Sequence, residues 1–143
     1  MIMDSQLLFS DAQAVTAAAA STNYVDLGKA RDIGNGKDLY VVTVVDVALT
    51  DSSSDSTVTV TLQTDDEATF SGAATGCTCY TVAATAAIGT TYIHRLGPGD
   101  ANAQYIQIYY TPNNGNLSTG SFTTFITTEP YKYASYPDGV TIS

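Results

Sequence analysis

The feature that most constrains the fold is a run of β-branched and aromatic residues at positions 40–47, YVVTVVDV. Such side chains are stiff at their first torsion angle and fit a pleated strand better than a helix. Apolar residues stand at both odd and even positions, so the strand is expected to be buried on both faces or covered by the second layer of a sandwich. The run therefore predicts a central strand, to which the rest of the chain adds further strands.

A glycine-rich loop precedes this run, with Gly28, Gly34 and Gly36 at positions where the backbone can take positive φ. A nucleotide-binding loop needs a strand before its glycines and a helix after them, whereas a strand follows here. The loop is therefore interpreted as a cluster of turns. We expect Arg31 and Asp32 to fix it by a local ion pair or by backbone hydrogen bonds.

Alternation of apolar and polar residues marks the other strands, most clearly at 57–63. A weaker strand is expected at 79–82, and others at 92–96, 105–111 and 120–128. The sequence PNNG at 112–115 predicts a hairpin turn that pairs 105–111 with 120–128, because Asn114 and Gly115 suit positive φ.

Several short strands without a convincing amphipathic helix predict an all-β fold, an antiparallel β-sandwich or jelly roll with extended N- and C-terminal arms. Strand count alone does not separate a jelly roll from an immunoglobulin-like topology. The core signature of a true immunoglobulin domain is missing, since the chain has no tryptophan and its two cysteines are two residues apart.

The chain of 143 residues, 44% of them hydrophobic, is long enough for one domain with a core. We expect an N-terminal arm or first strand at 1–22, the sandwich at 23–129 and a tyrosine-rich tail at 130–143. Alanine content alone favours a helix at 11–20, but the segment lacks an amphipathic face, so an extended conformation is preferred. Nothing in the sequence predicts export or membrane insertion.

The net charge of −9 disfavours binding to nucleic acid and to anionic membrane surfaces. Three of the five cations, Lys29, Arg31 and Lys37, nevertheless stand in the glycine-rich loop. They form a local positive island that is either an ordinary solvated turn or a contact with an acidic partner.

Metal binding is not expected from the sequence. Cys77 and Cys79 are too few for a disulfide framework, and on a strand both thiols would point to one face. A zinc site would need two further ligands, and His94 is the only histidine. The carboxylates at 65–67 do not have the spacing of an EF-hand loop, so a solvated loop is preferred to a calcium site.

Catalytic function is also not expected. No nucleophile motif, paired carboxylates or cofactor motif is recognisable. His94 lacks a serine or cysteine in a catalytic context and an obvious neighbouring acid, so it is interpreted as a surface or interface histidine.

Four stretches share a pattern with a known family: LLFSDAQAVT at 7–16, ST-N-x-x-DLG at 21–28, RD-I-G-x-G at 31–36 and LQT-D-D-x-x-x-F-S at 62–71. Together they resemble the Bbp16-like family of phage capsid cement proteins. The resemblance covers much of the N-terminal half and implies a jelly-roll protein on the outer surface of a tailed-phage head. There it would bridge neighbouring major capsid proteins as an oligomer, with no catalytic residues.

Acidic character and the absence of a disulfide framework suit a protein outside a DNA-filled shell that assembles in the bacterial cytoplasm. We prefer a homodimer to a homotrimer, because symmetric dimers are the commonest oligomers. Residues predicted to contact a partner are Leu7, Leu8 and Phe9, the cations Lys29, Arg31 and Lys37, and the tail tyrosines Tyr131, Tyr133 and Tyr136. For Leu7, Leu8 and Phe9, an equal alternative is that they cap this domain's own sandwich.

The alternative function is a carbohydrate-binding or adhesion module. It would present Tyr92, Tyr105, Tyr109 and Tyr110 to a sugar, as exposed tyrosines in line on one face can stack on sugar rings. Tyrosines at strand positions are more often found in a core or an interface.

Overall fold

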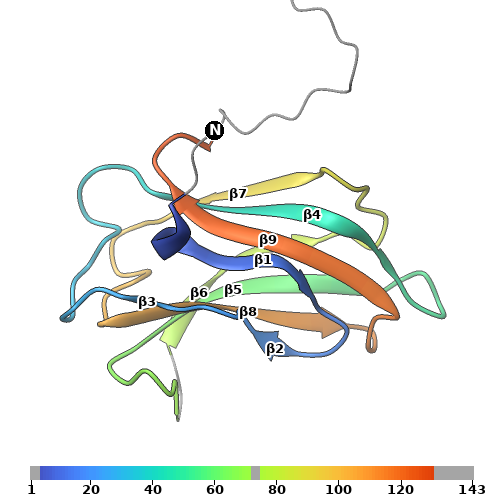
Figure 1. The fold of residues 1–143 in the computed structure, drawn as a ribbon, viewed down its shortest axis with the longest axis horizontal. Coiled ribbons are helices and arrows are strands. Elements are labelled where there is room, and N and C mark those ends of the chain that lie inside the picture. The colour runs from blue at the N-terminus through green and yellow to red at the C-terminus, as the bar shows by residue number, and fades with distance from the viewer. Residues whose placement is uncertain (1–3, 72–74, 131–143) are drawn as a thin grey trace, which may run out of the picture.

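The computed structural model describes residues 4–71 and 75–130, which form two antiparallel sheets packed face to face (Figure 1). Its elements are η1 (a 3-10 helix, Ser5–Leu7), β1 (Leu8–Ala14), β2 (Ala19–Ala20), β3 (Val25–Asp26), β4 (Tyr40–Thr50), β5 (Thr57–Asp65), β6 (Thr75–Val82), β7 (Thr91–Arg95), β8 (Tyr105–Asn113) and β9 (Thr119–Thr127).

The strand order is that of a jelly roll. One sheet has the order β1-β9-β4-β7 and the other the order β2-β8-β5-β6. β2 and β3 pair with β8 at Tyr109–Tyr110 and at Tyr105–Ile106, so they share one strand position on the same side of β8. Every connection between successive positions crosses to the other sheet except that between β5 and β6. This arrangement confirms the β-sandwich and shows that its topology is that of a jelly roll rather than an immunoglobulin-like domain.

β4 is an inner strand, as the run at 40–47 predicted. It pairs with β9 on one side and with β7 on the other. Val41 and Val45 are fully buried and face the core between the sheets. Of the other valines in the run, Val42 is buried, Val44 is half-buried and Val47 is 45% exposed, so the strand is fully covered on its core-facing side but not along both faces.

The facing strands β5 and β8 supply most of the opposite wall. Val58, Val60 and Leu62 are fully buried, while the threonines between them are half-exposed, which confirms the predicted alternation. In β8, Ile106, Ile108 and Tyr110 fill the same role. The Tyr110 ring stacks on Phe122 of the other sheet with 5.5 Å between ring centroids, so this pair joins the two layers.

The predicted hairpin at 112–115 is wrong in its pairing. Asn114 and Gly115 do take positive φ, 64° and 113°. However, β8 pairs with β2, β3 and β5, whereas β9 pairs with β1 and β4 in the other sheet. The turn therefore carries the chain across the sandwich, because each of these strands has an apolar face that must be buried against the opposite layer.

The N-terminal segment is part of the sandwich. β1 forms the edge strand beside β9, with Leu8 opposite Phe125, so the first-strand interpretation is confirmed and a helix at 11–20 is wrong. Gln13 fixes the corner after β1, since its amide donates to the carbonyl of Ala20 (2.8 Å) and its Oε1 accepts from the Ser10 hydroxyl (2.8 Å). Long-range pairing thus overrides local alanine propensity.

A chain of buried hydroxyls crosses the core. The Tyr80 hydroxyl donates to Thr43 Oγ1 (2.6 Å), and Thr43 Oγ1 lies 2.8 Å from Thr124 Oγ1. The Tyr110 hydroxyl then lies 2.8 Å from both Thr124 Oγ1 and Ser10 Oγ. Burial raises the pKa of Tyr110 and of Tyr80, so both phenols stay neutral and act as partners within this chain.

Candidate functional site

The glycine-rich loop packs backbone to backbone against the loop that follows β7. The Ile33 amide donates to the carbonyl of Ala101 (3.2 Å), and the Leu96 amide donates to that of Leu39 (2.9 Å). Between these bonds, Gly34 approaches Gly97 so closely that a Cβ on Gly34 would lie 1.8 Å from the Gly97 carbonyl oxygen. The loop is therefore structural, and only a residue without a side chain fits at position 34.

Asp32 holds both loops, as predicted. Its two carboxylate oxygens accept hydrogen bonds from the amides of Gly34 (3.1 Å) and Gly99 (3.0 Å). Arg31 is exposed and has no ion-pair partner among residues 4–71 and 75–130, so the hydrogen-bond alternative applies and the ion pair does not. Lys29 and Lys37 are exposed on the same loop.

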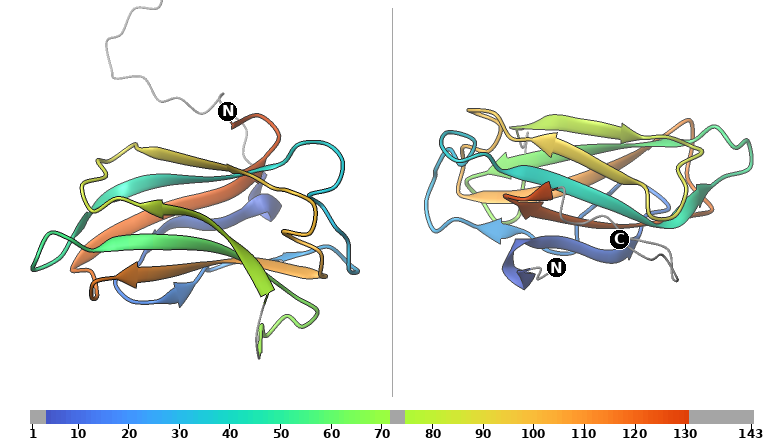
Figure 2. Two further views of the ribbon diagram at one scale, coloured as in Figure 1. Left: turned by 180° about the vertical axis from the view of Figure 1, so that it is seen from behind. Right: turned by 90° about the horizontal axis from the view of Figure 1, so that it is seen from above.

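β6 and β7 are the edge strands of opposite sheets and lie next to each other (Figure 2). Tyr80 and Tyr92 face each other across this edge, with 5.5 Å between ring centroids. The hydroxyl of Tyr92 accepts a hydrogen bond from the Ala83 amide (3.1 Å). The two edges are thus joined by side chains rather than by a backbone ladder.

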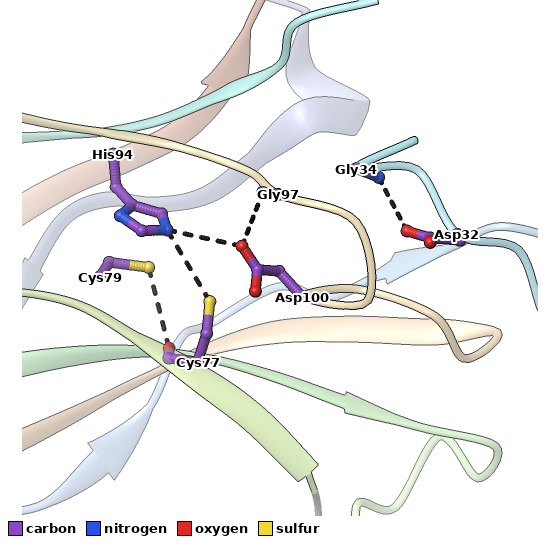
Figure 3. A network of polar contacts seen from close by, with 7 residues as sticks. All are labelled: Asp32, Gly34, Cys77, Cys79, His94, Gly97 and Asp100. Atoms are coloured by element: carbon purple, nitrogen blue, oxygen red, sulfur yellow. Dashed lines mark hydrogen bonds and ion pairs between the residues drawn. The ribbon is translucent and has the colours of Figure 1, made fainter. Parts of the chain in front are cut away.

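Beside the tyrosine pair, the same edge contains Cys77, Cys79 and His94 (Figure 3). Their two sulfurs and one ring nitrogen all lie within 4.8 Å of one another. Cys77 Sγ is 3.9 Å from His94 Nε2, and His94 Nε2 is 3.8 Å from Asp100 Oδ2. We call these four residues the edge cluster.

A β-bulge in β6 puts Tyr80 on the same face as the two thiols. Val60 pairs with Tyr80 and Thr61 pairs with Thr78, so Cys79 is an extra residue without a partner in the ladder. The bulge lets Cys77, Cys79 and Tyr80 all pack against the core, which strict alternation would not allow.

The other half of the edge cluster comes from β7 and the turn after it. His94 stands opposite Val41 in the ladder and alternates with the exposed Ile93 and Arg95, so its ring points inward. Asp100 folds back because its Oδ2 accepts a hydrogen bond from the Gly97 amide (2.6 Å). Side-chain exposures of 26% for His94 and 28% for Asp100 leave the edge cluster reachable from solvent.

The two thiols differ in their electrostatic environment. The hydrogen bond from Cys79 lowers the pKa of Cys77, although burial and the charge of Asp100 oppose this effect. The same hydrogen bond, together with burial, raises the pKa of Cys79.

Two expectations about these residues need correction. His94 does have a neighbouring acid, Asp100, and His94 itself stands beside the cysteine pair as a further candidate ligand. Asp100 was missed altogether. The available signal was its position after the turn Gly97-Pro98-Gly99, which follows the strand of His94 and reverses the chain.

The predicted partner-binding residues of the N-terminus divide into two groups. Phe9 is fully buried in this domain's own core, so its assignment to a partner is wrong. Leu7 and Leu8 are half-buried. The tail residues Tyr131, Tyr133 and Tyr136 lie outside the described residues.

Leu7 lines an open hollow of about 380 Å³ together with Gln6, Tyr24, Val25 and Asp26. Tyr24 is 50% exposed, and its ring makes edge contacts with Phe70 and Tyr105 (centroid distances 6.2 and 5.8 Å). This exposed aromatic was not singled out from the sequence, where it is one of ten tyrosines.

The remaining candidates do not form sites among the described residues. Tyr110 is fully buried and Tyr92 faces inward, so the four tyrosines proposed to stack sugars do not share one exposed face. In the acidic loop, Asp65 accepts from the Glu67 amide (3.1 Å), and Glu67 accepts from the Ser71 hydroxyl (2.7 Å). These carboxylates therefore shape their own loop.

The fold defines an all-β jelly-roll protein whose two sheets are joined at one edge by the edge cluster. Residues 9–126 match the family model Bbp16, and this match covers the sandwich from β1 to β9. The chain therefore belongs to the Bbp16 family, a phage-associated family, and is a phage-related structural protein. No curated protein matches the chain. None of the helices in the described ranges is long and apolar enough to cross a membrane.

Proposed function

We propose that this chain is a capsid cement, or decoration, protein that binds the outside of a tailed-phage head and stabilises contacts between major capsid proteins. The observation that carries this proposal is the family match over residues 9–126, which extends from β1 into β9. The protein acts as a homo-oligomer, with a homodimer preferred, and joins the head inside the bacterial cell. Its partners are protein surfaces, neither nucleic acid nor membrane, and it performs no catalysis.

Physical chemistry supports the outer surface as its place. A packaged genome is a dense polyanion, and a protein of net charge −9 is repelled from the inside of such a shell. A subunit that binds the assembled lattice but not its free components stabilises that lattice by mass action. Binding at a hundredfold excess over the Kd contributes about 2.7 kcal/mol per site.

The direct test mixes the purified protein with heads that lack it. Co-sedimentation should saturate at a fixed ratio to the major capsid protein, and decorated heads should survive heating to a higher temperature than bare heads. Sedimentation velocity of the free protein measures whether it is a dimer. Heads that neither bind the protein nor gain thermal stability would exclude the cement role.

The cationic loop is the first surface to test. Lys29, Arg31 and Lys37 are exposed, and an acidic capsid surface would be attracted to them. Changing all three to glutamine should weaken head binding about tenfold or more at low salt and reduce its salt dependence, with little effect on the melting temperature.

A matched control places three negative charges elsewhere, for example Thr81→Glu, Thr85→Glu and Thr91→Glu, at exposed positions on or near β6 and β7. These changes alter the net charge by the same amount. Equal loss of binding in the two triple variants would show that net charge matters and that the loop is only a connector.

The hollow beside η1 is the second surface. Tyr24→Ser removes a half-exposed ring, and we expect roughly tenfold weaker head binding, because partly exposed tyrosines anchor interfaces. Ile88→Ser is the control, since Ile88 is 70% exposed but lies in the loop between β6 and β7. If both variants bind heads like the wild type, the hollow is not an interface.

A further inference from the structure

The geometry points to the edge cluster as a zinc site, in which Cys77, Cys79, His94 and Asp100 bind one Zn²⁺ and link the edge strands β6 and β7. This role concerns the jelly roll itself and stands whether or not the protein decorates a capsid.

Distances within the edge cluster are close to those of a tetrahedral site. Zinc–sulfur bonds of about 2.3 Å and zinc–nitrogen or zinc–oxygen bonds of about 2.0–2.1 Å place neighbouring ligand atoms about 3.3–3.8 Å apart. Cys77 Sγ and His94 Nε2 are 3.9 Å apart, and His94 Nε2 and Asp100 Oδ2 are 3.8 Å apart. Both sulfurs and the ring nitrogen lie within 4.8 Å of one another, and Asp100 Oδ2 joins them through its distance to His94 Nε2, so side-chain movements of up to about 1 Å would close the site.

The ligand set selects the metal. Two thiolates and an imidazole do not suit Mg²⁺ or Ca²⁺, which take oxygen ligands. Copper(I) favours soft sulfur ligands, whereas the carboxylate of Asp100 is a hard one. A tetrahedral site with sulfur, nitrogen and oxygen donors suits Zn²⁺, and each cysteine loses its thiol proton to solvent on binding.

The surroundings already hold the ligands in place. The Gly97 amide donates to the carboxylate of Asp100 (2.6 Å), and the Asp32 carboxylate fixes the same turn through the Gly99 amide (3.0 Å). Hydrogen bonds of this kind to ligating carboxylates and their loops typically orient a metal site. The bulge at Cys79 leaves this residue outside the ladder with β5.

The effect of the metal would be to clamp the two sheets at an edge where the backbone makes no ladder. β6 and β7 belong to different sheets, so the metal would connect them covalently through four side chains. Zinc at a hundredfold excess over its Kd should raise the melting temperature by roughly 5–10 °C.

The experiment uses untagged full-length protein, stripped of metal and kept reduced with a phosphine. Titration with Co²⁺ should give one ion per chain, with the visible bands of tetrahedral cobalt and a thiolate charge-transfer band. One equivalent of Zn²⁺ should abolish these bands, and competition with a chromogenic chelator should give a zinc Kd below about 1 µM.

The variants separate ligands from neighbours. Cys77→Ser and His94→Gln should each weaken zinc binding by at least about a hundredfold and abolish the thermal gain, while Asp100→Asn should weaken it about tenfold. Controls are Thr78→Ser on β6 and Ile93→Val on β7, both exposed neighbours, and these should bind as the wild type does.

A folded wild-type protein that gives no tetrahedral cobalt spectrum and no zinc-dependent rise in melting temperature would overturn the inference. So would full zinc affinity in His94→Gln, because the metal would then lie elsewhere. Circular dichroism tests whether each variant is folded. If a variant is unfolded, the metal titration of the wild-type protein still tests the zinc site.

Discussion

Replacement of Gly34 by alanine is expected to destabilise the protein by roughly 3 kcal/mol or more. An added Cβ would lie 1.8 Å from the Gly97 carbonyl oxygen and 2.5 Å from its carbon. Both neighbours are backbone atoms, so the clash is relieved only if the two loops separate and lose the hydrogen bond that the Gly99 amide donates to the Asp32 carboxylate. Urea denaturation followed by circular dichroism measures the change.

Asn35→Ala is the matched control, because Asn35 is the next residue along the loop and is exposed. Its free energy of unfolding should lie within about 0.5 kcal/mol of the wild-type value. Equal midpoints for Gly34→Ala and Asn35→Ala would show that the two loops do not pack as closely as described.

Tyr110 is expected to be the most sensitive side chain of the core. Tyr110→Ala removes a fully buried ring that stacks on Phe122, and a loss of about 3–5 kcal/mol follows from the cavity. Tyr110→Phe keeps the ring but leaves the hydroxyls of Ser10 and Thr124 without their shared partner, which should cost about 1–3 kcal/mol.

The neighbouring residue provides the comparison. Tyr109 points away from the core and is half-exposed, so Tyr109→Phe should change stability by less than about 0.5 kcal/mol. A double-mutant cycle of Tyr110→Phe with Thr124→Val should show coupling of about 0.5–1.5 kcal/mol. Additive effects would mean that the buried hydroxyls contribute independently rather than as a connected chain.

Local patterns predicted the strands well but not their partners. The alternation at 57–63 and the apolar run at 40–47 correspond to β5 and β4, since a two-residue period shows directly which face is buried. The pairing of β8 with β9 was mispredicted because a turn with positive φ suits both a hairpin and a crossover. Which one forms depends on the opposite layer, and that information is not local.

The edge cluster shows the same limit for a site. Cys77 and Cys79 were recognised as a pair, but their relation to His94 depends on two edge strands of different sheets lying side by side. The bulge at Cys79 and the reversed turn before Asp100 add two further departures from regular periodicity. The glycines at positions 97 and 99 predict a turn, but they do not predict the direction in which the side chain of Asp100 points.

The position of β9 has a consequence for synthesis of the protein. β9 lies between β1 and β4, although the residues of β9 are synthesised after both of these strands. Until they emerge, β1 has no strand to pair with and one side of β4 stays open. Folding of this sheet therefore waits until β9 is synthesised, and a chain that stops before residue 119 would present unpaired strand edges that favour aggregation.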